Sequence, residues 1–251
     1  MSYKSEKINP YDEKGSKKEQ VAQMFDQIAP TYDKLNGVLS LGIDNYWRFD
    51  AIKKLKPYAP KRILDIATGT GDFAILAHHK LNPESIIGID ISSGMLAVGE
   101  QKIREKGLEN VISFEQQDCS AMTFDDNTFD AVTVAFGVRN FEDIDAGFQE
   151  VLRVLKPGGV FLFMELSTPE RFPMKQLYGF YSKYIIPVMG KVMSTDKDAY
   201  EYLPESIEAF PQGREMMMIL QKNGFTRIRM QRYTQGISIV YIAEKPIAGN
   251  A

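Results

Sequence analysis

The chain has 251 residues, 44% of them hydrophobic, which is enough to bury a sizeable core in one large domain or in a domain with an appendage. Its formal net charge is −3, with one short basic cluster near the start, so we expect no nucleic-acid partner. The single cysteine, Cys119, cannot form an internal disulfide, and the two adjacent histidines give no zinc-binding pattern, so we expect no metal site.

The first part of the chain predicts a flexible tail followed by helices. Residues 1–16 are polar and predict the tail. Apolar residues at helical spacing from Val21 to Asn36, interrupted near Pro30, and a second such pattern over 45–55 predict an N-terminal helical unit over 17–56. Neither a secretory leader nor an apolar run of membrane-spanning length is visible. We therefore expect a cytoplasmic protein, with the inner surface of a membrane as an alternative location.

The sequence pattern of residues 57–251 differs from that of the first part. Here short β-branched runs alternate with amphipathic segments. Five runs predict strands, at 62–67, 85–91, 111–117, 129–136 and 159–166. Three segments between them predict helices, at 73–80, 92–106 and 143–155. Strands that are apolar on both faces, with crossover helices between them, predict a doubly wound α/β domain with a parallel sheet. Two last strands, 227–233 and 236–244, are joined by a short turn and should pair antiparallel, which makes a mostly parallel sheet of seven strands.

The stretch ILDIATGTGD, residues 63–72, joins the first strand to its helix through a glycine turn. Gly69, Gly71 and Ala74 satisfy the pattern Gly-x-Gly-x-x-Ala, and Asp90 follows about twenty residues later at the end of the second strand. Glycines let the backbone approach a ligand, and the later carboxylate can accept hydrogen bonds from a ribose diol. A dinucleotide such as NAD and an adenosyl sulfonium fit this pattern equally well.

Carboxylates near the turn favour the sulfonium. Asp65 and Asp72 flank the turn, close to a helix N-terminus where a pyrophosphate would otherwise bind. Asp65 could orient the loop amides or meet the methionyl ammonium, and Asp72 could equally be a helix cap. Asp118, just past the third strand, can accept from an adenine amino group while Cys119 offers its backbone N–H. This set indicates S-adenosylmethionine as the cofactor.

The order of these motifs over residues 60–167 resembles class I S-adenosylmethionine-dependent methyltransferases. Two longer stretches, Tyr32–Arg48 and Arg153–Ser167, are similar to the two signatures of the ubiquinone and menaquinone C-methyltransferase family, as are FGVRN and DAYEYLPESI. The resemblance implies an N-terminal helical lid over 17–56 and a substrate-side insertion over 169–205. It also implies cofactor contacts at Thr70, Asp90, Asp118 and Cys119. It leaves the oligomeric state open, a homodimer included.

The reaction implied by this resemblance moves a methyl group to a ring carbon of a prenylated naphthoquinol, with a benzoquinol as the alternative acceptor. Carbon is a poor nucleophile until a neighbouring phenol, which ordinarily titrates near pH 10, loses its proton. Arg139 and Asn140 follow the fourth strand, where its carboxyl end meets the cofactor. We hypothesise that Arg139 stabilises the phenolate, with an ordered water as proton acceptor, and that Asn140 orients the ring.

Two further segments have both a functional and a structural interpretation. Tyr32, Asp33, Asn36 and Trp47 could fold over the site and exclude water, or belong to a packed helical hairpin. Residues 171–194 carry four cations without an acid among many aromatic side chains, and could rest on anionic lipid or be a solvated face over a core helix. The cations are Arg171, Lys175, Lys183 and Lys191.

Two other functions share the predicted fold. A small-molecule O- or N-methyltransferase would have the same cofactor residues and a different acceptor pocket. An NAD-dependent oxidoreductase would use the same glycine turn. A base-modifying nucleic-acid methyltransferase is disfavoured, because AFGVRN stands where the amino-methylating enzymes have an Asn/Asp-Pro-Pro-aromatic turn.

Overall fold

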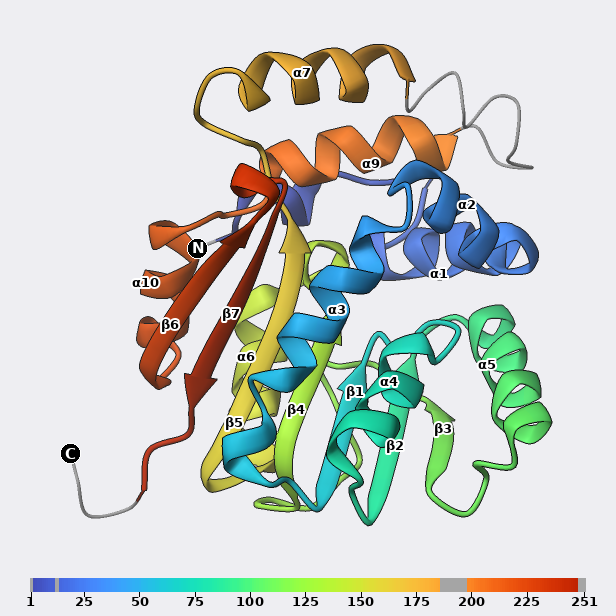
Figure 1. The fold of residues 1–251 in the computed structure, drawn as a ribbon, viewed down its shortest axis with the longest axis vertical. Helices are drawn as coiled ribbons and strands as arrows, with labels where there is room; N and C mark the ends of the chain where they lie inside the picture. Colours follow the sequence, from blue (N-terminus) through green and yellow to red (C-terminus); the bar gives the residue numbers. More distant parts are fainter. Residues whose placement is uncertain (1, 12–13, 186–197, 248–251) are drawn as a thin grey trace.

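A seven-stranded sheet forms the centre of the molecule, which is known here from a computed structural model that describes residues 2–11, 14–185 and 198–247 (Figure 1). The strand order is β3-β2-β1-β4-β5-β7-β6, with β7 antiparallel to both of its neighbours and the other strands parallel. This confirms the predicted α/β fold with a mostly parallel sheet. The strands are β1 (Arg62–Ile66), β2 (Ser85–Asp90), β3 (Ile112–Gln116), β4 (Phe129–Ala135), β5 (Leu155–Leu166), β6 (Thr226–Tyr233) and β7 (Ser238–Glu244).

Helices cover both faces of the sheet. Successive residues of a strand point to opposite faces, so a strand that is apolar throughout must be covered on both. In β1, Leu64 packs in the cluster with α6 and α10, whereas Ile63 packs in the cluster with α3 and α4. The helices of these two layers are α3 (Ile43–Lys53), α4 (Asp72–Leu81), α5 (Ser93–Lys106), α6 (Ile144–Val154) and α10 (Arg214–Lys222). The helix α3, which falls inside the predicted lid, therefore covers the sheet beside α4.

Helix capping fixes where the chain enters two of these helices. The Ser92 side chain accepts from the Met95 N–H at 3.1 Å, and the Asp143 side chain accepts from the Ala146 N–H at 2.8 Å. Gly107 ends α5 in the left-handed conformation, with φ of 64°. These caps place the loops after β2 and β4 at the same edge of the sheet.

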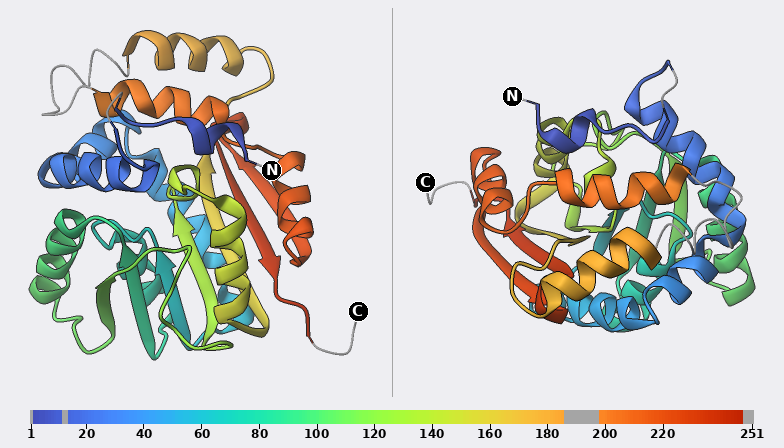
Figure 2. Two further views of the ribbon diagram at one scale, coloured as in Figure 1. Left: turned by 180° about the vertical axis from the view of Figure 1, so that it is seen from behind. Right: turned by 90° about the horizontal axis from the view of Figure 1, so that it is seen from above.

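A third layer lies across the carboxyl ends of the parallel strands (Figures 1 and 2). Met24 and Ile28 of α1 pack there with Met95 of α5 and Tyr202 of α9. The longer elements of this layer are α1 (Lys17–Ile28), α2 (Tyr32–Leu39), α7 (Met174–Phe180), η5 (Tyr181–Ile185) and α9 (Asp198–Ala209). Short turns of helix complete the chain: η1 (Lys4–Lys7), η2 (Ala29–Thr31), η3 (Lys56–Tyr58), η4 (Val138–Asn140) and η6 (Thr234–Gly236).

Residues 2–11, from which the sequence predicts a flexible tail, lie against the carboxyl edge. The Tyr3 hydroxyl donates to Asp145 at 3.0 Å, and Glu6 accepts from the Ile144 N–H at 2.9 Å. Ser5 is fully buried. Within the described residues, the structure has no helix that is both long and apolar enough to cross a bilayer.

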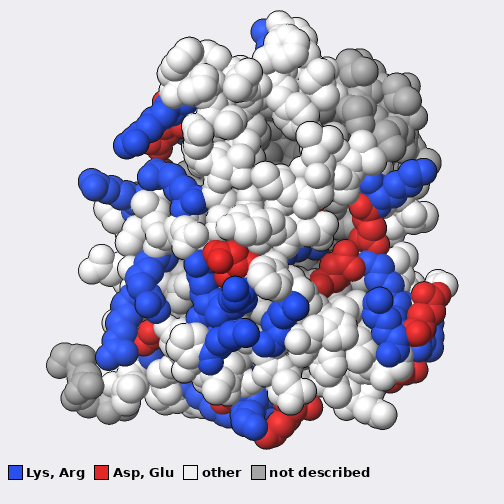
Figure 3. Space-filling view, in the orientation of Figure 1, with Lys and Arg blue, Asp and Glu red and all other residues white. Residues whose placement is uncertain are grey.

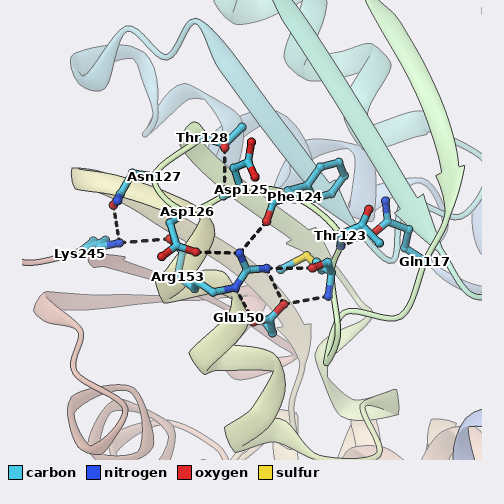
Figure 4. A network of polar contacts seen from close by, with 11 residues as sticks. Gln117, Thr123, Phe124, Asp125, Asp126, Asn127, Thr128, Glu150, Arg153 and Lys245 are labelled. Atoms are coloured by element: carbon cyan, nitrogen blue, oxygen red, sulfur yellow. Dashed lines mark hydrogen bonds and ion pairs between the residues drawn. The ribbon is translucent and has the colours of Figure 1, made fainter.

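Arg153 holds the long connection between β3 and β4 in place (Figure 4). Its guanidinium donates to Glu150 at 2.6 Å, to the Phe124 carbonyl at 2.6 Å and to Asp126 at 2.9 Å. This arginine begins the second family signature, and its contacts are structural.

Candidate active site

Two cavities lie side by side at the carboxyl ends of the strands. The β1–β4 cavity, of about 860 Å³, is bounded by the loops after β1, β2 and β4, the segment after β3 and the helix α1. The α2–α9 cavity, of about 1030 Å³, lies beneath α2, α7 and α9. Phe25, Tyr32 and Phe136 line both, so the cavities share an aromatic wall.

Asp90 connects the end of β2 with the glycine turn. Its Oδ2 accepts from the Gly69 N–H at 2.8 Å and its Oδ1 from the Ser92 N–H at 2.9 Å. Each carboxylate oxygen keeps a lone pair for a further donor, and the residue lines the β1–β4 cavity. Gly69 has φ of 56°, and a side chain there would meet only open space, so this glycine leaves room for a ligand.

Asp118 and Cys119 form the wall opposite the glycine turn. Asp118 accepts from the Ser120 N–H and hydroxyl at 2.8 Å and forms an ion pair with Lys18 of α1 at 2.9 Å. Burial alone would raise the pKa of Asp118, but these hydrogen bonds hold it below its usual value. Burial raises the pKa of the Cys119 thiol, which argues against a thiolate nucleophile.

Three residues in and near the glycine turn support the site without lining the cavity. They are Asp65, Thr70 and Gly71. Asp65 is buried and accepts from the hydroxyls of Thr68, at 2.7 Å, and Thr133, at 2.6 Å. It therefore orients the loop, one of its two expected roles. The Thr70 hydroxyl donates to Asp33 of α2 at 2.7 Å, joining the turn to the helical layer.

Arg139, on the short helix η4, lines the α2–α9 cavity and pairs with Glu165, a residue that the sequence reasoning missed. Its Nη1 lies 3.0 Å from Glu165 Oε2 and also donates to the Phe136 carbonyl, while its backbone N–H donates to Glu165 Oε1 at 3.1 Å. Its Nε is buried without a partner. A carboxylate inside the apolar run of β5 was the available signal, because a buried charge needs a partner.

Asn140 follows Arg139 but faces the other cavity, whose wall it joins. Its Oδ1 accepts from the Tyr202 hydroxyl of α9 at 3.0 Å. The structure thus divides the two predicted catalytic residues between the cavities and brings them together at their shared boundary.

The helix α1 supplies residues that the sequence reasoning did not single out. Lys18 and Val21 line the β1–β4 cavity along with Phe25. Of the predicted lid residues, Tyr32 lines both cavities, and Asn36 and Trp47 line the α2–α9 cavity. An amphipathic pattern predicts a buried face but not what that face covers.

The charge of the β1–β4 cavity distinguishes the two candidate ligands. Of the side chains that the structure describes, four carboxylates and one cation, Lys18, line this cavity, and Lys18 is already paired with Asp118. An anionic pyrophosphate would be repelled there, whereas a cationic sulfonium is favoured. The other three carboxylates are Asp90, Glu142 and Asp143. Among the described residues, no cluster of His, Cys, Asp or Glu could hold a metal ion.

This sheet order, with an acidic cavity at the point where the order reverses, is that of the class I methyltransferase fold. The model of the ubiE/COQ5 methyltransferase family matches residues 13–245. The chain belongs to this family.

Curated relatives match along nearly the whole chain. Demethylmenaquinone methyltransferase of Bacteroides fragilis is 56% identical over 245 residues, covering 98% of this chain and 100% of the relative. The protein of the same name from Porphyromonas gingivalis is 46% identical over 241 residues, covering 96% and 98%. A ubiquinone/menaquinone biosynthesis C-methyltransferase from Geobacter sulfurreducens is 41% identical, covering 96% and 94%.

Solved structures share the fold at low sequence identity. The [4+2]-cyclase SpnF superposes with a TM-score of 0.68 at 17% identity, covering 92% of this chain and 97% of that one. A possible histamine N-methyltransferase from Thermotoga maritima gives 0.62 at 17% identity, covering 89% and 99%. Because a cyclase shares this fold, the architecture alone does not determine the reaction.

Proposed function

We propose that the enzyme transfers a methyl group from S-adenosylmethionine to a ring carbon of a prenylated naphthoquinol, converting demethylmenaquinol to menaquinol. The observation that carries this proposal is the α2–α9 cavity, whose mostly apolar and aromatic walls suit a quinol ring and which shares a wall with the acidic cavity. Relatives named demethylmenaquinone methyltransferase support the same acceptor. A benzoquinol is the alternative, since other relatives are named for both pathways.

We assign the β1–β4 cavity to the methyl donor. Asp90 accepts from the ribose diol, Asp118 and the Cys119 N–H contact the adenine, and Gly69 allows close approach of the methionyl portion. Asp65, Thr70 and Gly71 hold these groups in position. When bound, S-adenosylmethionine supplies an electrophilic methyl group.

Arg139 stabilises the anion that forms on the acceptor oxygen. Its Nε is a buried donor without a partner, and Glu165 fixes the guanidinium from the other side. The apolar cavity makes this electrostatic contribution larger than it would be in water. Asn140, held by Tyr202, lines the donor cavity and keeps the boundary between the two cavities in place.

The experiment supplies labelled S-adenosylmethionine with reduced demethylated naphthoquinone and benzoquinone acceptors in parallel, and locates the transferred methyl by NMR. We expect a carbon-bound methyl, with the naphthoquinol preferred. Arg139→Ala should lower kcat by about 10²–10³-fold, the effect of removing one donor to a developing anion, while the Kd for S-adenosylhomocysteine stays unchanged.

The matched control for this variant is Arg104→Ala, which removes an exposed arginine on α5 that pairs with Glu100. It should leave both kcat and the Kd unchanged. A methyl group found on oxygen or nitrogen would refute the proposed reaction. An equal loss of turnover and donor affinity in Arg139→Ala would refute the role of Arg139.

We further propose that the enzyme acts at the inner face of the membrane through an α7 surface, defined as the exposed side chains of residues 171–185. Leu177, Phe180 and Tyr184 are exposed by 60%, 60% and 51%. Figure 3 shows little charge over the described upper part of the molecule, where Figure 1 places α7. Apolar side chains rimmed by cations suit an anionic lipid surface. The other exposed side chains of this surface are Arg171, Phe172, Pro173, Lys175, Gln176, Lys183 and Ile185.

The same segment also borders the acceptor cavity, which supports this location. Tyr178 and Tyr181 line the α2–α9 cavity, while their neighbours Leu177 and Phe180 point outward. A prenyl tail could therefore remain in lipid while the ring enters the cavity. Lys191, Ile186 and the rest of the predicted basic face lie outside the described residues.

Vesicle sedimentation tests this surface. Lys175→Gln with Lys183→Gln should weaken binding to anionic vesicles by about thirtyfold, because about 1 kcal/mol is lost per basic residue. Leu177→Ser with Phe180→Ser should also weaken it, because less apolar surface is buried in the lipid. Activity on an acceptor with a short tail should be retained. Met218→Ser, which changes an exposed apolar side chain on α10, is the control. Unchanged vesicle binding in both double variants would refute the proposal.

A further inference from the structure

The wall of the α2–α9 cavity is mostly apolar and aromatic, and its charged side chains lie at two corners. One corner is Arg139. The other is formed by α2 and the start of α3, which contribute Asn36, Ser40, Asp44 and Arg48. Asp44 is the one carboxylate among the described residues that line this cavity, and neither the family signatures nor the relatives' names assign it a role.

Asp44 is arranged as a partly free hydrogen-bond acceptor. It is 8% exposed, and its Oδ1 accepts from the Ser40 hydroxyl at 2.5 Å. Its Oδ2 lies 3.5 Å from Arg48 Nη2, too far for a strong hydrogen bond, so this oxygen retains lone pairs. The residue is in the first turn of α3, where the helix dipole favours a negative charge.

Phe136 brings this corner close to Arg139. The Arg48 guanidinium lies over the Phe136 ring, 5.4 Å from its centroid, and the Phe136 carbonyl accepts from Arg139. The Nε atoms of both arginines are buried without a partner. Phe136 also lines the β1–β4 cavity. Arg48 therefore connects the Asp44 corner to Phe136, the residue whose carbonyl accepts from Arg139.

We propose that Asp44 is the proton acceptor of the reaction, an inference that rests on the proposed function. The O–H bond of the quinol hydroxyl next to the methylated carbon breaks, the proton bonds to Asp44 Oδ2, and the electron pair stays on the quinol oxygen. Arg139 and Arg48 stabilise that anion. After methylation the ring carbon releases its own proton to water, and Asp44 returns its proton to the oxygen, so one proton is released per turnover.

The acidity of the quinol distinguishes a proton acceptor at Asp44 from a residue with a structural role. Moving a proton from a phenol to a carboxylate is unfavourable in water by about six pKa units, so the step depends on the acceptor's own pKa. A quinol that is already ionised at the assay pH needs no residue to accept its proton. A residue that only shapes the cavity would matter equally for every acceptor.

The test compares wild type with Asp44→Asn on naphthohydroquinones that carry an increasing number of chlorines on the ring that is not methylated. On the unsubstituted acceptor we expect Asp44→Asn to lower kcat by about 10²–10³-fold, the usual size of general-base catalysis, with the Kd for S-adenosylhomocysteine unchanged. The ratio of wild-type to variant kcat should fall below about tenfold for acceptors that ionise below the assay pH.

Two variants control for folding and position. Asp50→Asn changes another carboxylate of α3, which pairs with Lys54 and Tyr233 and lines neither cavity, and it should leave kcat within about twofold of wild type. Ser40→Ala removes the hydrogen bond to Oδ1 but keeps the carboxylate. It should retain the wild-type dependence on acceptor acidity.

Each remaining outcome contradicts the proposal in a recognisable way. A kcat ratio that stays constant across the acceptor series would show a structural role for Asp44. An Asp44→Asn enzyme as active as wild type would point to water as the proton acceptor. A wild-type enzyme that methylates no quinol would overturn the proposed function, and the role of Asp44 with it.

Discussion

Phe114 on β3 is surrounded by three glycines from three different elements. A Cβ atom added at Gly71, Gly88 or Gly99 would lie 2.6, 2.6 or 2.9 Å from an atom of its ring. Such separations are shorter than packed atoms tolerate. The glycine turn therefore has two purposes, since Gly71 makes room for this ring while Gly69 makes room for a ligand.

Gly88→Ala should destabilise the protein by about 1–3 kcal/mol, because the new methyl group would overlap Phe114 and lie 2.8 Å from Thr68 Oγ1. The free energy of unfolding in urea measures this. Phe114→Leu in the same chain should recover part of the loss, so the two changes should be less than additive. Simple additivity would show that the ring does not limit position 88.

Asp65→Asn should change how stability depends on pH. Burial raises the pKa of Asp65 to about 6, while the unfolded carboxyl titrates near 4. Between these values the unfolded chain releases a proton that the native state keeps, so rising pH destabilises the wild type. The stability difference should therefore shift by about 3 kcal/mol in favour of the variant between pH 4 and 7. Parallel stability curves from denaturation at each pH would contradict this.

At the residue scale, the sequence predicted the side chains that stand at strand ends and missed those that depend on tertiary contacts. Asp90 and Asp118 follow strands, and both line the cavity as expected. Glu165 lies within a strand and Asp44 within a helix, where only the packed structure shows what each side chain faces. Spacing along one element carries no information about the partner on another.

At the scale of elements, a carboxylate of α1 joins this helix to the start of α5. Asp26 Oδ1 accepts from the Ser92 hydroxyl at 2.6 Å and from the Gly94 N–H at 2.8 Å. The sequence predicted helical periodicity here and its interruption near Pro30. It did not separate α1, which borders the β1–β4 cavity, from α3, which covers the sheet, because both show the same amphipathic pattern.

Asp26→Ala should weaken the binding of S-adenosylhomocysteine by at least about tenfold, because α1 would lose two hydrogen bonds to a charged acceptor, each worth about 1.5–3 kcal/mol. Calorimetry gives the affinity, and hydrogen exchange should show faster exchange confined to α1. Asp125→Ala, at an exposed position in the β3–β4 loop, is the control. Unchanged affinity would mean that α1 does not contribute to the donor site.

Across the whole molecule, segments far apart in the sequence meet at Lys17. Its buried Nζ donates to the Ser5 carbonyl at 2.6 Å and to the Arg139 carbonyl at 3.0 Å, joining η1, α1 and η4. The fold class and the mostly parallel sheet could be predicted because each parallel strand and its crossover helix are local in sequence. This junction could not, since about 120 residues separate Lys17 from Arg139.

Lys17→Met should remove a dependence of stability on alkaline pH. Burial lowers the pKa of Lys17 to about 8, below its unfolded value of 10.5. The unfolded chain thus binds more protons between these values, and wild-type stability should rise relative to the variant by about 3 kcal/mol from pH 8 to 10.5. Denaturation across this range tests the sign, and a fall in the wild type relative to the variant would contradict it.

The aromatic wall formed by Phe25, Tyr32 and Phe136 separates two compartments, and each of these side chains has a face in both. A mutation that reshapes this wall to admit a different quinone therefore also changes the binding of the methyl donor. Divergence towards new acceptors would proceed more freely through Trp47, Tyr178 and Leu203, which border the acceptor side alone.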